Sequence, residues 1–366
     1  MKNASKLTMG CTLVILVLSM GTSSCATSQG LILEEIGQID TGGDTFDVQV
    51  VGNTCYVADM ADAGGGLVII DVKDPSNPVE IGNYYDGGLP HEIFVDGDLV
   101  YMADHYDGLE IINVSIPSNP VEIGHYIDNG EIDGVFVDGT TAYLVEWIDS
   151  SWSSEIVILD VSNPLQPLKL GEYIDGGSAR RIKVSNDLAY VSGGSDGLKV
   201  INVSDPANPS LISSYNDGGG AFALQIVGNT VYVADGSDGL EIIDVSNPVA
   251  LVEIGQFDGY EFMCDVQVIG STAYLADHDE GFVIVDISDA TNITELARFD
   301  HEKNIGIHVH GTYAFMALHE HGLKIIQIGN ASSGSSATVP AFELPTIITG
   351  LVAILALNWK KNRKTI

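Results

Sequence analysis

The chain has 366 residues and a formal net charge of −35, because 50 acidic residues face only 15 lysines and arginines. A surface this negative repels phosphate backbones and anionic lipids, which excludes nucleic acid as the expected partner. The sequence also lacks the GxxxxGK[ST] and HExxH motifs, so enzymes that depend on those motifs are not expected.

Residues 1–26 have the pattern of an export signal peptide. Two lysines in the first six residues precede an apolar segment over residues 11–20, and small residues follow it. This order is typical of secretory signals, and we expect cleavage after Ala26. The alternative is a lipoprotein acylated at Cys25, although the residues before that cysteine lack the usual aliphatic side chain.

Residues 31–330 contain seven copies of one unit. An aromatic residue at the same place in each copy recurs every 41 to 47 residues: Tyr56, Tyr101, Tyr143, Tyr190, Tyr232, Tyr274 and Phe315. A period of this length that holds four short strands is typical of propeller blades. The third strand of each copy is an almost continuous apolar run, which indicates burial on both faces between neighbouring blades. The sequence therefore predicts an all-β, seven-bladed β-propeller of four-stranded antiparallel blades.

The first strand of this region has a special role in the prediction. Residues 31–40 resemble the fourth-strand sequence at 252–258, whereas the seventh copy has no fourth strand after Gln327. We expect the N-terminal strand to complete the last blade, because this closes the ring and removes two open sheet edges. Cys55 and Cys264 fall in blades 1 and 6, which are not neighbours, so we expect two buried thiols and no disulfide.

The repeat resembles the LVIVD-repeat family. Its motif occurs as LVIID at 67–71 and FVIVD at 282–286, and the resemblance covers about residues 31–330. It implies a surface or secreted β-propeller and no single activity. Asn113, Asn202 and Gln327 replace the aspartate of the motif, which indicates that this position caps a turn and does not bind a ligand.

The C-terminal part resembles the three-part surface anchors of prokaryotic, particularly archaeal, exported proteins. Residues 331–343 form a Ser/Gly-rich linker, residues 344–359 an apolar transmembrane helix and residues 360–366 a basic cytoplasmic tail. A helix over 344–359 rises about 24 Å, so it needs local membrane thinning or snorkelling lysines. We expect a single-pass protein of the cell membrane with its propeller on the extracellular side.

Acidic residues gather on one side of the predicted propeller. In an up-and-down blade the turns after strands two and four reach one side, which we call the top face, and strand one begins there. We expect ligand contacts around the central funnel of this face, from the residues that begin the first strands: His91, Glu92, Asp133, Arg180, Arg181 and Asp265.

The top face also carries candidate metal ligands. The spacing Asp104-x-x-Asp107-Gly-x-Glu110 recurs as Asp235-x-x-Asp238-Gly-x-Glu241 and could present several oxygens to Ca²⁺, although neither segment is an EF-hand loop. The alternative is that the Asp-Gly pairs are hairpin turns on a solvated rim. Asp277 and His278, together with other top-face histidines such as His91 and His105, suit a transition metal such as Zn²⁺.

Trp147 and Trp152 lie in an insertion after the second strand of blade 3. Tryptophans beside small polar residues are typical of surfaces that bind sugars or proteins, although a long loop also buries its own side chains. We therefore expect a monomeric binding or scaffolding module that needs no cofactor, with calcium as a candidate ion and a surface protein or glycan as partner. The alternative is a metal-dependent hydrolase with a His/Asp site in the top funnel.

Overall fold

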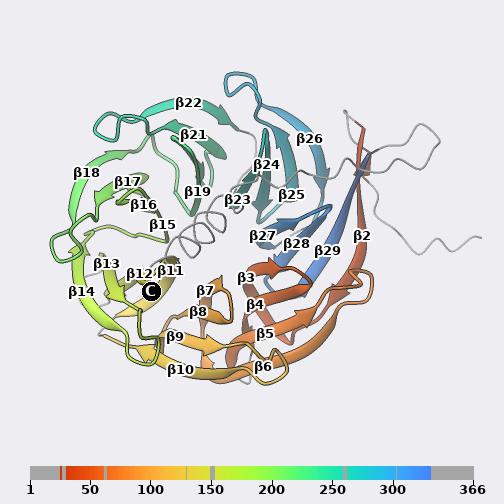
Figure 1. Ribbon diagram of the computed structural model, residues 1–366. Coiled ribbons are helices and arrows are strands. Elements are labelled where there is room, and N and C mark those ends of the chain that lie inside the picture. Colours follow the sequence, from red (N-terminus) through yellow and green to blue (C-terminus); the bar gives the residue numbers. More distant parts are fainter. Residues whose placement is uncertain are drawn as a thin grey trace, which may run out of the picture.

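The computed structural model describes residues 25–26, 30–61, 64–128, 130–148, 153–258, 262–301 and 303–330. Every regular element within these ranges is a β-strand. The strands form seven antiparallel sheets arranged around a central axis (Figure 1). The predicted all-β, seven-bladed propeller is therefore confirmed.

Six blades each consist of four consecutive strands, with the first strand at the central axis and the fourth at the rim. Blade 1 has β3 (Gly43–Val51), β4 (Thr54–Ala61), β5 (Gly65–Asp71) and β6 (Val79–Gly88), and blade 2 has β7 (Pro90–Asp96), β8 (Leu99–Asp104), β9 (Gly108–Asn113) and β10 (Val121–Tyr126). Blade 3 has β11 (Glu131–Asp138), β12 (Thr141–Ile148), β13 (Ser153–Asp160) and β14 (Leu168–Ile174). Blade 4 has β15 (Arg181–Ser185), β16 (Leu188–Ser192), β17 (Leu198–Asn202) and β18 (Ser210–Tyr215). Blade 5 has β19 (Ala223–Val227), β20 (Thr230–Ala234), β21 (Leu240–Asp244) and β22 (Val252–Phe257), and blade 6 has β23 (Met263–Ile269), β24 (Thr272–Asp277), β25 (Gly281–Asp286) and β26 (Thr294–Phe299).

Blade 7 is built from both ends of the propeller. Its inner strands are β27 (Asn304–His310), β28 (Tyr313–Leu318) and β29 (Gly322–Asn330), and the N-terminal strand β2 (Leu31–Ile39) pairs antiparallel with β29. This confirms the predicted ring closure. A short strand that was not predicted, β1 (Cys25–Ala26), pairs with the outer side of β2.

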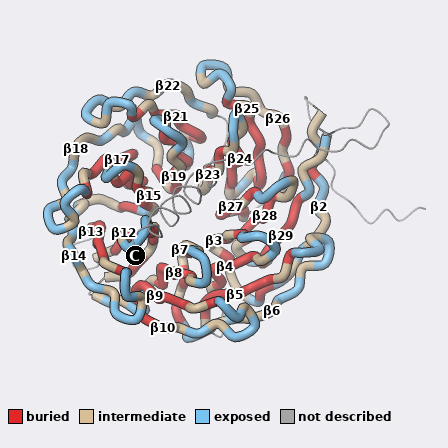
Figure 2. Tube along the Cα trace, in the orientation of Figure 1, coloured by how far each residue is buried: buried red, intermediate tan, exposed pale blue. Residues whose placement is uncertain are grey.

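The burial pattern follows from the stacking of the blades. The third strand β5 is buried at six consecutive residues, whereas the outer strand β22 alternates between exposed and intermediate residues. Figure 2 shows this gradient from buried middle strands to partly exposed strands at the rim. Apolar side chains of adjacent blades meet in shared clusters, as between β25 and blade 7. The continuous apolar runs of the sequence are thus explained by burial on both faces.

The turns behave as the sequence indicates. The hairpin between the first two strands of blade 4 places Asn186 and Asp187 at φ of 53° and 61°, a conformation that these residues tolerate better than most. The motif aspartate caps the turn after the third strand, since the Oδ1 of Asp71 accepts the N–H of Lys73 at 2.9 Å. Asn113 does the same for the N–H of Ser115 at 2.9 Å, which confirms a capping role for this position.

The predicted membrane anchor and its flanking segments lie outside the described residues, as does the predicted signal peptide apart from β1. Among the described residues, no helix is long and apolar enough to span a membrane. Both cysteines that lie within the propeller are free, but only Cys55 is buried as expected. Cys264 is partly exposed, because it stands at the mouth of the central channel.

Candidate functional site

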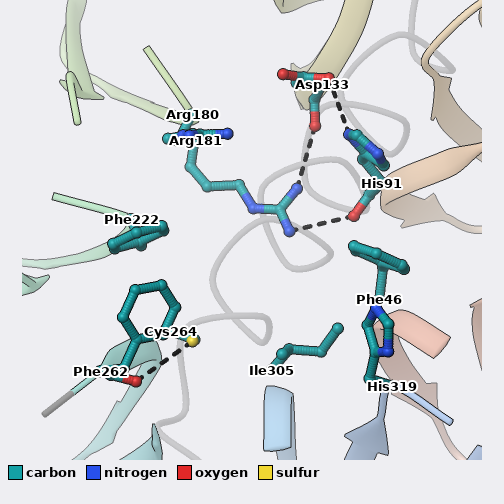
Figure 3. A pocket seen from close by; sticks show the side chains of 10 residues that line it. All are labelled: Phe46, His91, Asp133, Arg180, Arg181, Phe222, Phe262, Cys264, Ile305 and His319. Atoms are coloured by element: carbon teal, nitrogen blue, oxygen red, sulfur yellow. Dashed lines mark hydrogen bonds and ion pairs between the residues drawn. The ribbon is translucent and has the colours of Figure 1, made fainter. Parts of the chain in front are cut away.

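Seven side chains, one from each blade, surround the top mouth of the central channel. Each lies just before or within the first half of an inner strand, two residues before a buried aliphatic residue of that strand: Val48, Ile93, Val135, Ile182, Leu224, Val266 and Ile307. We call them the mouth ring: Phe46, His91, Asp133, Arg180, Phe222, Cys264 and Ile305. With Arg181, Phe262 and His319 they line a cavity of about 220 Å³ (Figure 3).

The mouth ring has a polar arc and an apolar arc. Blades 2, 3 and 4 contribute His91, Asp133 and Arg180, whereas blades 5, 6, 7 and 1 contribute the remaining members, of which all but Cys264 are hydrocarbon side chains. Aromatic contacts extend the apolar arc, since the ring of Phe262 lies 4.8 Å from that of Phe222. Phe46 continues it toward the polar arc and stacks on His91 at 5.3 Å. A ligand in this cavity meets an aromatic wall on one side and charged groups on the other.

The two predicted arginines have different roles. Arg181 is held below the mouth, where its guanidinium donates to the backbone oxygens of Asp133 and His91 at 3.2 and 3.1 Å and lies 3.3 Å from the carboxylate of Glu92. Arg180 is exposed and lies 5.7 Å above the centre of the Phe222 ring. Arg180 makes no ion pair within the described part of the chain. Its positive charge therefore faces the cavity.

Glu92 and Asp265, both predicted to contact a ligand, connect neighbouring blades. Glu92 accepts the N–H of Val135 in blade 3, and Asp265 accepts the N–H of Ile307 in blade 7, each at 2.9 Å. Asp47 makes the same contact with blade 2, and burial raises its pKa to about 6 although Arg181 opposes this shift. These carboxylates lie along the wall of a second cavity of about 280 Å³ beneath the mouth.

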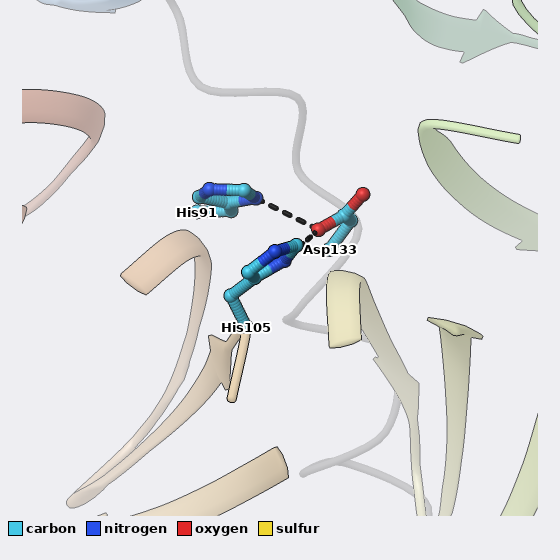
Figure 4. A group of neighbouring side chains, drawn as sticks. All are labelled: His91, His105 and Asp133. Carbon is cyan, nitrogen blue, oxygen red and sulfur yellow. Dashed lines mark hydrogen bonds and ion pairs between the residues drawn. The ribbon is translucent and has the colours of Figure 1, made fainter. Parts of the chain in front are cut away.

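His91, His105 and Asp133 form the closest cluster at the mouth (Figure 4). One oxygen of Asp133 lies 2.8 Å from the Nδ1 atoms of both histidines, and the Nε2 of His105 lies 3.0 Å from Glu131. Burial opposes ionisation of Asp133, but the two histidine hydrogen bonds outweigh it and hold the pKa of Asp133 well below its usual range. Burial of His105 opposes its protonation, but the hydrogen bond to Asp133 and the charges of Asp133 and Glu131 raise the pKa of His105. These three groups are close enough to ligate a metal, yet here both histidines form hydrogen bonds with Asp133.

The predicted calcium ligands fall into two clusters away from the mouth, and each includes a residue that sequence spacing did not suggest. Asp104 gathers with Glu110 and with Asp86 from blade 1, and Asp235 and Asp238 gather with Asp217 from blade 4. Burial, followed by the carboxyl of Asp86, raises the pKa of Glu110 to about 10. Asp107 is exposed and adds to the negative potential at Asp104.

Asp277 and His278 do not join these clusters. Asp277 is fully buried, and its carboxylate accepts the backbone N–H groups of Asp279 and Glu280 at 2.9 and 2.8 Å. His278 instead pairs with Asp279 at 2.8 Å. Among the described residues, this pair therefore meets no further metal-ligating group at bonding distance.

The described residues of the blade-3 insertion belong to strands. Strand β12 continues through Trp147, which pairs with Ser154 on β13, and the Trp147 side chain is only half-exposed. The prediction that Trp147 lies in a loop is therefore wrong, because the pairing of β12 with β13 continues past this residue. Trp152 lies outside the described residues.

Sequence reasoning missed the apolar members of the mouth ring. Phe46, Phe222 and Ile305 are unremarkable as single residues, because apolar side chains are common in every repeat. Aligning the seven copies on the buried aliphatic residue two positions further along the inner strand brings all seven mouth positions into one column. The useful signal is that this column holds six different residue types over seven blades, whereas the core column two residues further along remains aliphatic.

Fold and site together define a seven-bladed β-propeller with an amphipathic pocket at one mouth of its channel. The LVIVD repeat model matches residues 42–86, 87–128, 130–175, 176–217, 218–259, 263–301 and 304–337. The chain therefore belongs to the LVIVD-repeat family. No curated protein matches it significantly.

Two solved structures share the fold at low sequence identity. The computationally designed Ika8 protein is 8% identical with a TM-score of 0.59, and the match covers 80% of this chain and 99% of that one. A functionally unknown protein from Desulfotomaculum acetoxidans is 12% identical with a TM-score of 0.57, over 75% of this chain and 89% of that one. At these identities the similarity establishes the fold alone.

Proposed function

We propose that this protein is an exported, membrane-anchored binding module at the cell surface, whose acidic top face holds a ligand at the mouth ring. The observation that supports a binding role is the division of the mouth ring into a charged arc and an aromatic arc around one cavity. The signal-like residues 1–26 and the apolar, basic C-terminal part support export and anchoring.

The ligand that suits this pocket has an apolar face and a carboxylate. Arg180 has no ion-pair partner among the described residues of a protein whose net charge is strongly negative, and its guanidinium lies over the ring of Phe222. Aromatic faces suit the C–H faces of a sugar ring, and a guanidinium binds a carboxylate with two parallel hydrogen bonds. An acidic sugar of a surface glycan presents both groups together. We therefore infer that the partner is a carboxylated glycan.

The experiment compares immobilised oligosaccharides that differ only in their carboxylates, at physiological salt. Wild-type protein is expected to prefer the carboxylated form, and Arg180→Ala to lose that preference by at least about tenfold, the value of one charge-assisted hydrogen bond. Phe222→Ala is expected to weaken binding of both forms. The matched control is Lys73→Ala, which removes a cation from the turn after β5 on the opposite face. Equal binding of both glycans, or binding unchanged by both pocket variants, contradicts the proposal.

The alternative of a metal-dependent hydrolase rests on His91, His105 and Asp133, whose atoms are close enough to share one ion. Metal analysis of the purified protein separates the two functions. One stoichiometric transition metal, lost on His105→Ala, favours the hydrolase. Calcium alone or no metal favours the binding module.

A further inference from the structure

Two groups of four carboxylates occupy equivalent places between neighbouring blades. The first, which we call the blade-2 cluster, consists of Asp86 from the end of β6 together with Asp104, Asp107 and Glu110 of blade 2. The second, the blade-5 cluster, consists of Asp217 after β18 together with Asp235, Asp238 and Glu241 of blade 5. Three members of each lie close enough that one oxygen from each falls within 4.8 Å of the others.

The inner members of both clusters are buried, and each has one carboxylate oxygen without a hydrogen-bond donor among the described residues. Asp104 is 0% exposed and Glu110 3%, and Asp235 and Glu241 are 2% and 3% exposed. Each of the four has a carboxylate oxygen that receives no hydrogen bond from any described group. A buried carboxylate in this state is costly, because it has lost its water without gaining a partner. Among the described residues, neither cluster contains a positive group that balances its charge.

Blade 4 contains a similar arrangement, in which Gly193 stands where the other two blades have Asp104 and Asp235 and a lysine supplies a positive charge. The residue equivalent to Glu110 and Glu241 is Lys199, and its ammonium lies 2.9 Å from Asp175 and 2.8 Å from Asp196. These two aspartates are the counterparts of Asp86 and Asp107. In blade 7, Lys324 again takes this position and pairs with Glu35 at 2.9 Å. In both blades where the third strand carries a lysine at this position, the lysine ammonium pairs with a carboxylate.

A glycine next to each site shows that the same small space is used in all three blades. A Cβ atom on Gly88 would lie 1.9 Å from an oxygen of Asp104, and one on Gly219 would lie 2.1 Å from an oxygen of Asp235. In blade 4, a Cβ on Gly177 would lie 2.0 Å from Asp196 and 2.8 Å from the ammonium of Lys199. The space beside this glycine therefore holds carboxylates in blades 2 and 5, and a carboxylate with its cation in blade 4.

We propose that the blade-2 cluster and the blade-5 cluster each bind one Ca²⁺ ion, which replaces the lysine ammonium of blade 4 and links each blade to its predecessor. The ligands are all hard oxygens, which Ca²⁺ prefers. Two oxygens that both lie about 2.4 Å from one ion are at most about 4.8 Å apart, which matches the spacing of each cluster. Asp86 and Asp217 are exposed at the top face, so the ion has a path from solvent.

These sites differ from the mouth pocket in place and in role. None of their eight carboxylates lines the cavity at the mouth ring. Because Asp86 and Asp217 belong to the preceding blades, each ion joins two blades and adds to the stability of the ring without contacting the ligand. Calcium binding at these two clusters can therefore be tested independently of glycan binding at the mouth ring.

The test replaces the glutamate of each cluster with the lysine that blade 4 carries at the equivalent position. Calcium is titrated calorimetrically into purified full-length protein that has been freed of metal with a chelator. Wild-type protein is expected to bind two Ca²⁺ ions, Glu110→Lys and Glu241→Lys one each, and the double variant none. In chelator, the lysine variants are expected to melt at a higher temperature than wild type, because the introduced ammonium pairs with the neighbouring aspartates as Lys199 does.

The matched control is Glu80→Lys, which makes the same charge reversal on the exposed outer strand of blade 1. It is expected to retain both ions. Absence of calcium binding to wild type, or two ions still bound to the double variant, overturns the proposal. A single ion lost in only one of the two variants confines the site to that blade. The wild-type stoichiometry decides the matter even if a lysine variant fails to fold.

Discussion

Truncating Leu33 tests the closure of the ring by the N-terminal strand. Leu33 on β2 is 0% exposed and packs into the cluster that joins blades 6 and 7, whereas its neighbour Ile32 is 40% exposed. In the observed register Leu33 faces Ile328 and Ile32 faces Gly329 on β29. Successive side chains on a strand point to opposite faces, so the two residues report on the two sides of β2.

The expected magnitudes follow from these exposures. Leu33→Ala removes a fully buried side chain and leaves a cavity, which lowers the free energy of unfolding by about 3 kcal/mol. Ile32→Ala removes a side chain that is largely in contact with water, at a cost of about 1 kcal/mol. A shift of the strand by one residue would reverse this order, because it would turn Ile32 inward.

The assay is urea unfolding of wild type and both variants, followed by tryptophan fluorescence and by far-UV circular dichroism. Coincident transitions justify a two-state treatment and hence the comparison of free energies. A cost for Leu33→Ala that equals or falls below that of Ile32→Ala would refute the proposed pairing of β2 with β29.

Two further predictions concern the channel and the topology. Burial, followed by the neighbouring His310, lowers the pKa of His308 to about 4 from its usual 6.5; its contribution to stability is therefore complete above pH 6.5 and is lost as the pH falls toward 4. His308→Gln is expected to remove this part of the pH dependence and to raise the free energy of unfolding by about 1 kcal/mol, because Gln267 at the equivalent position accepts the N–H of Val309 in the next blade. Urea unfolding at pH 4, 5, 6 and 7 measures this free energy, and an unchanged pH dependence contradicts the prediction. Protease added to intact cells is expected to release a soluble product that ends between Gly329 and Pro340, since the linker follows the last strand there; mass spectrometry of the supernatant finds that end, and a protected propeller with an accessible basic tail would reverse the proposed orientation.

The sequence by itself determined the fold because the repeat records the same local physics seven times. Apolar runs such as LVIID at 67–71 can be buried on both faces only between stacked sheets, and the turn glycines mark where each hairpin ends. The incomplete seventh copy and the unpaired strand at 31–40 then left one way to close the ring. Periodicity of this kind is a local property, so it can be recognised without knowing how the chain folds.

The candidate sites depended on distances between residues that are far apart in the sequence. Asp86 joins Asp104 and Glu110 only because the end of one blade lies over the next, whereas spacing within the loop could suggest only Asp104, Asp107 and Glu110. The mouth pocket brings together Phe46 and Arg180, which are separated by three blades along the chain. The rotation from blade to blade decides which side chains meet, and that rotation is set by packing between sheets. The repeat fixed where each residue stands in its own blade, and only the closed ring decided what it faces.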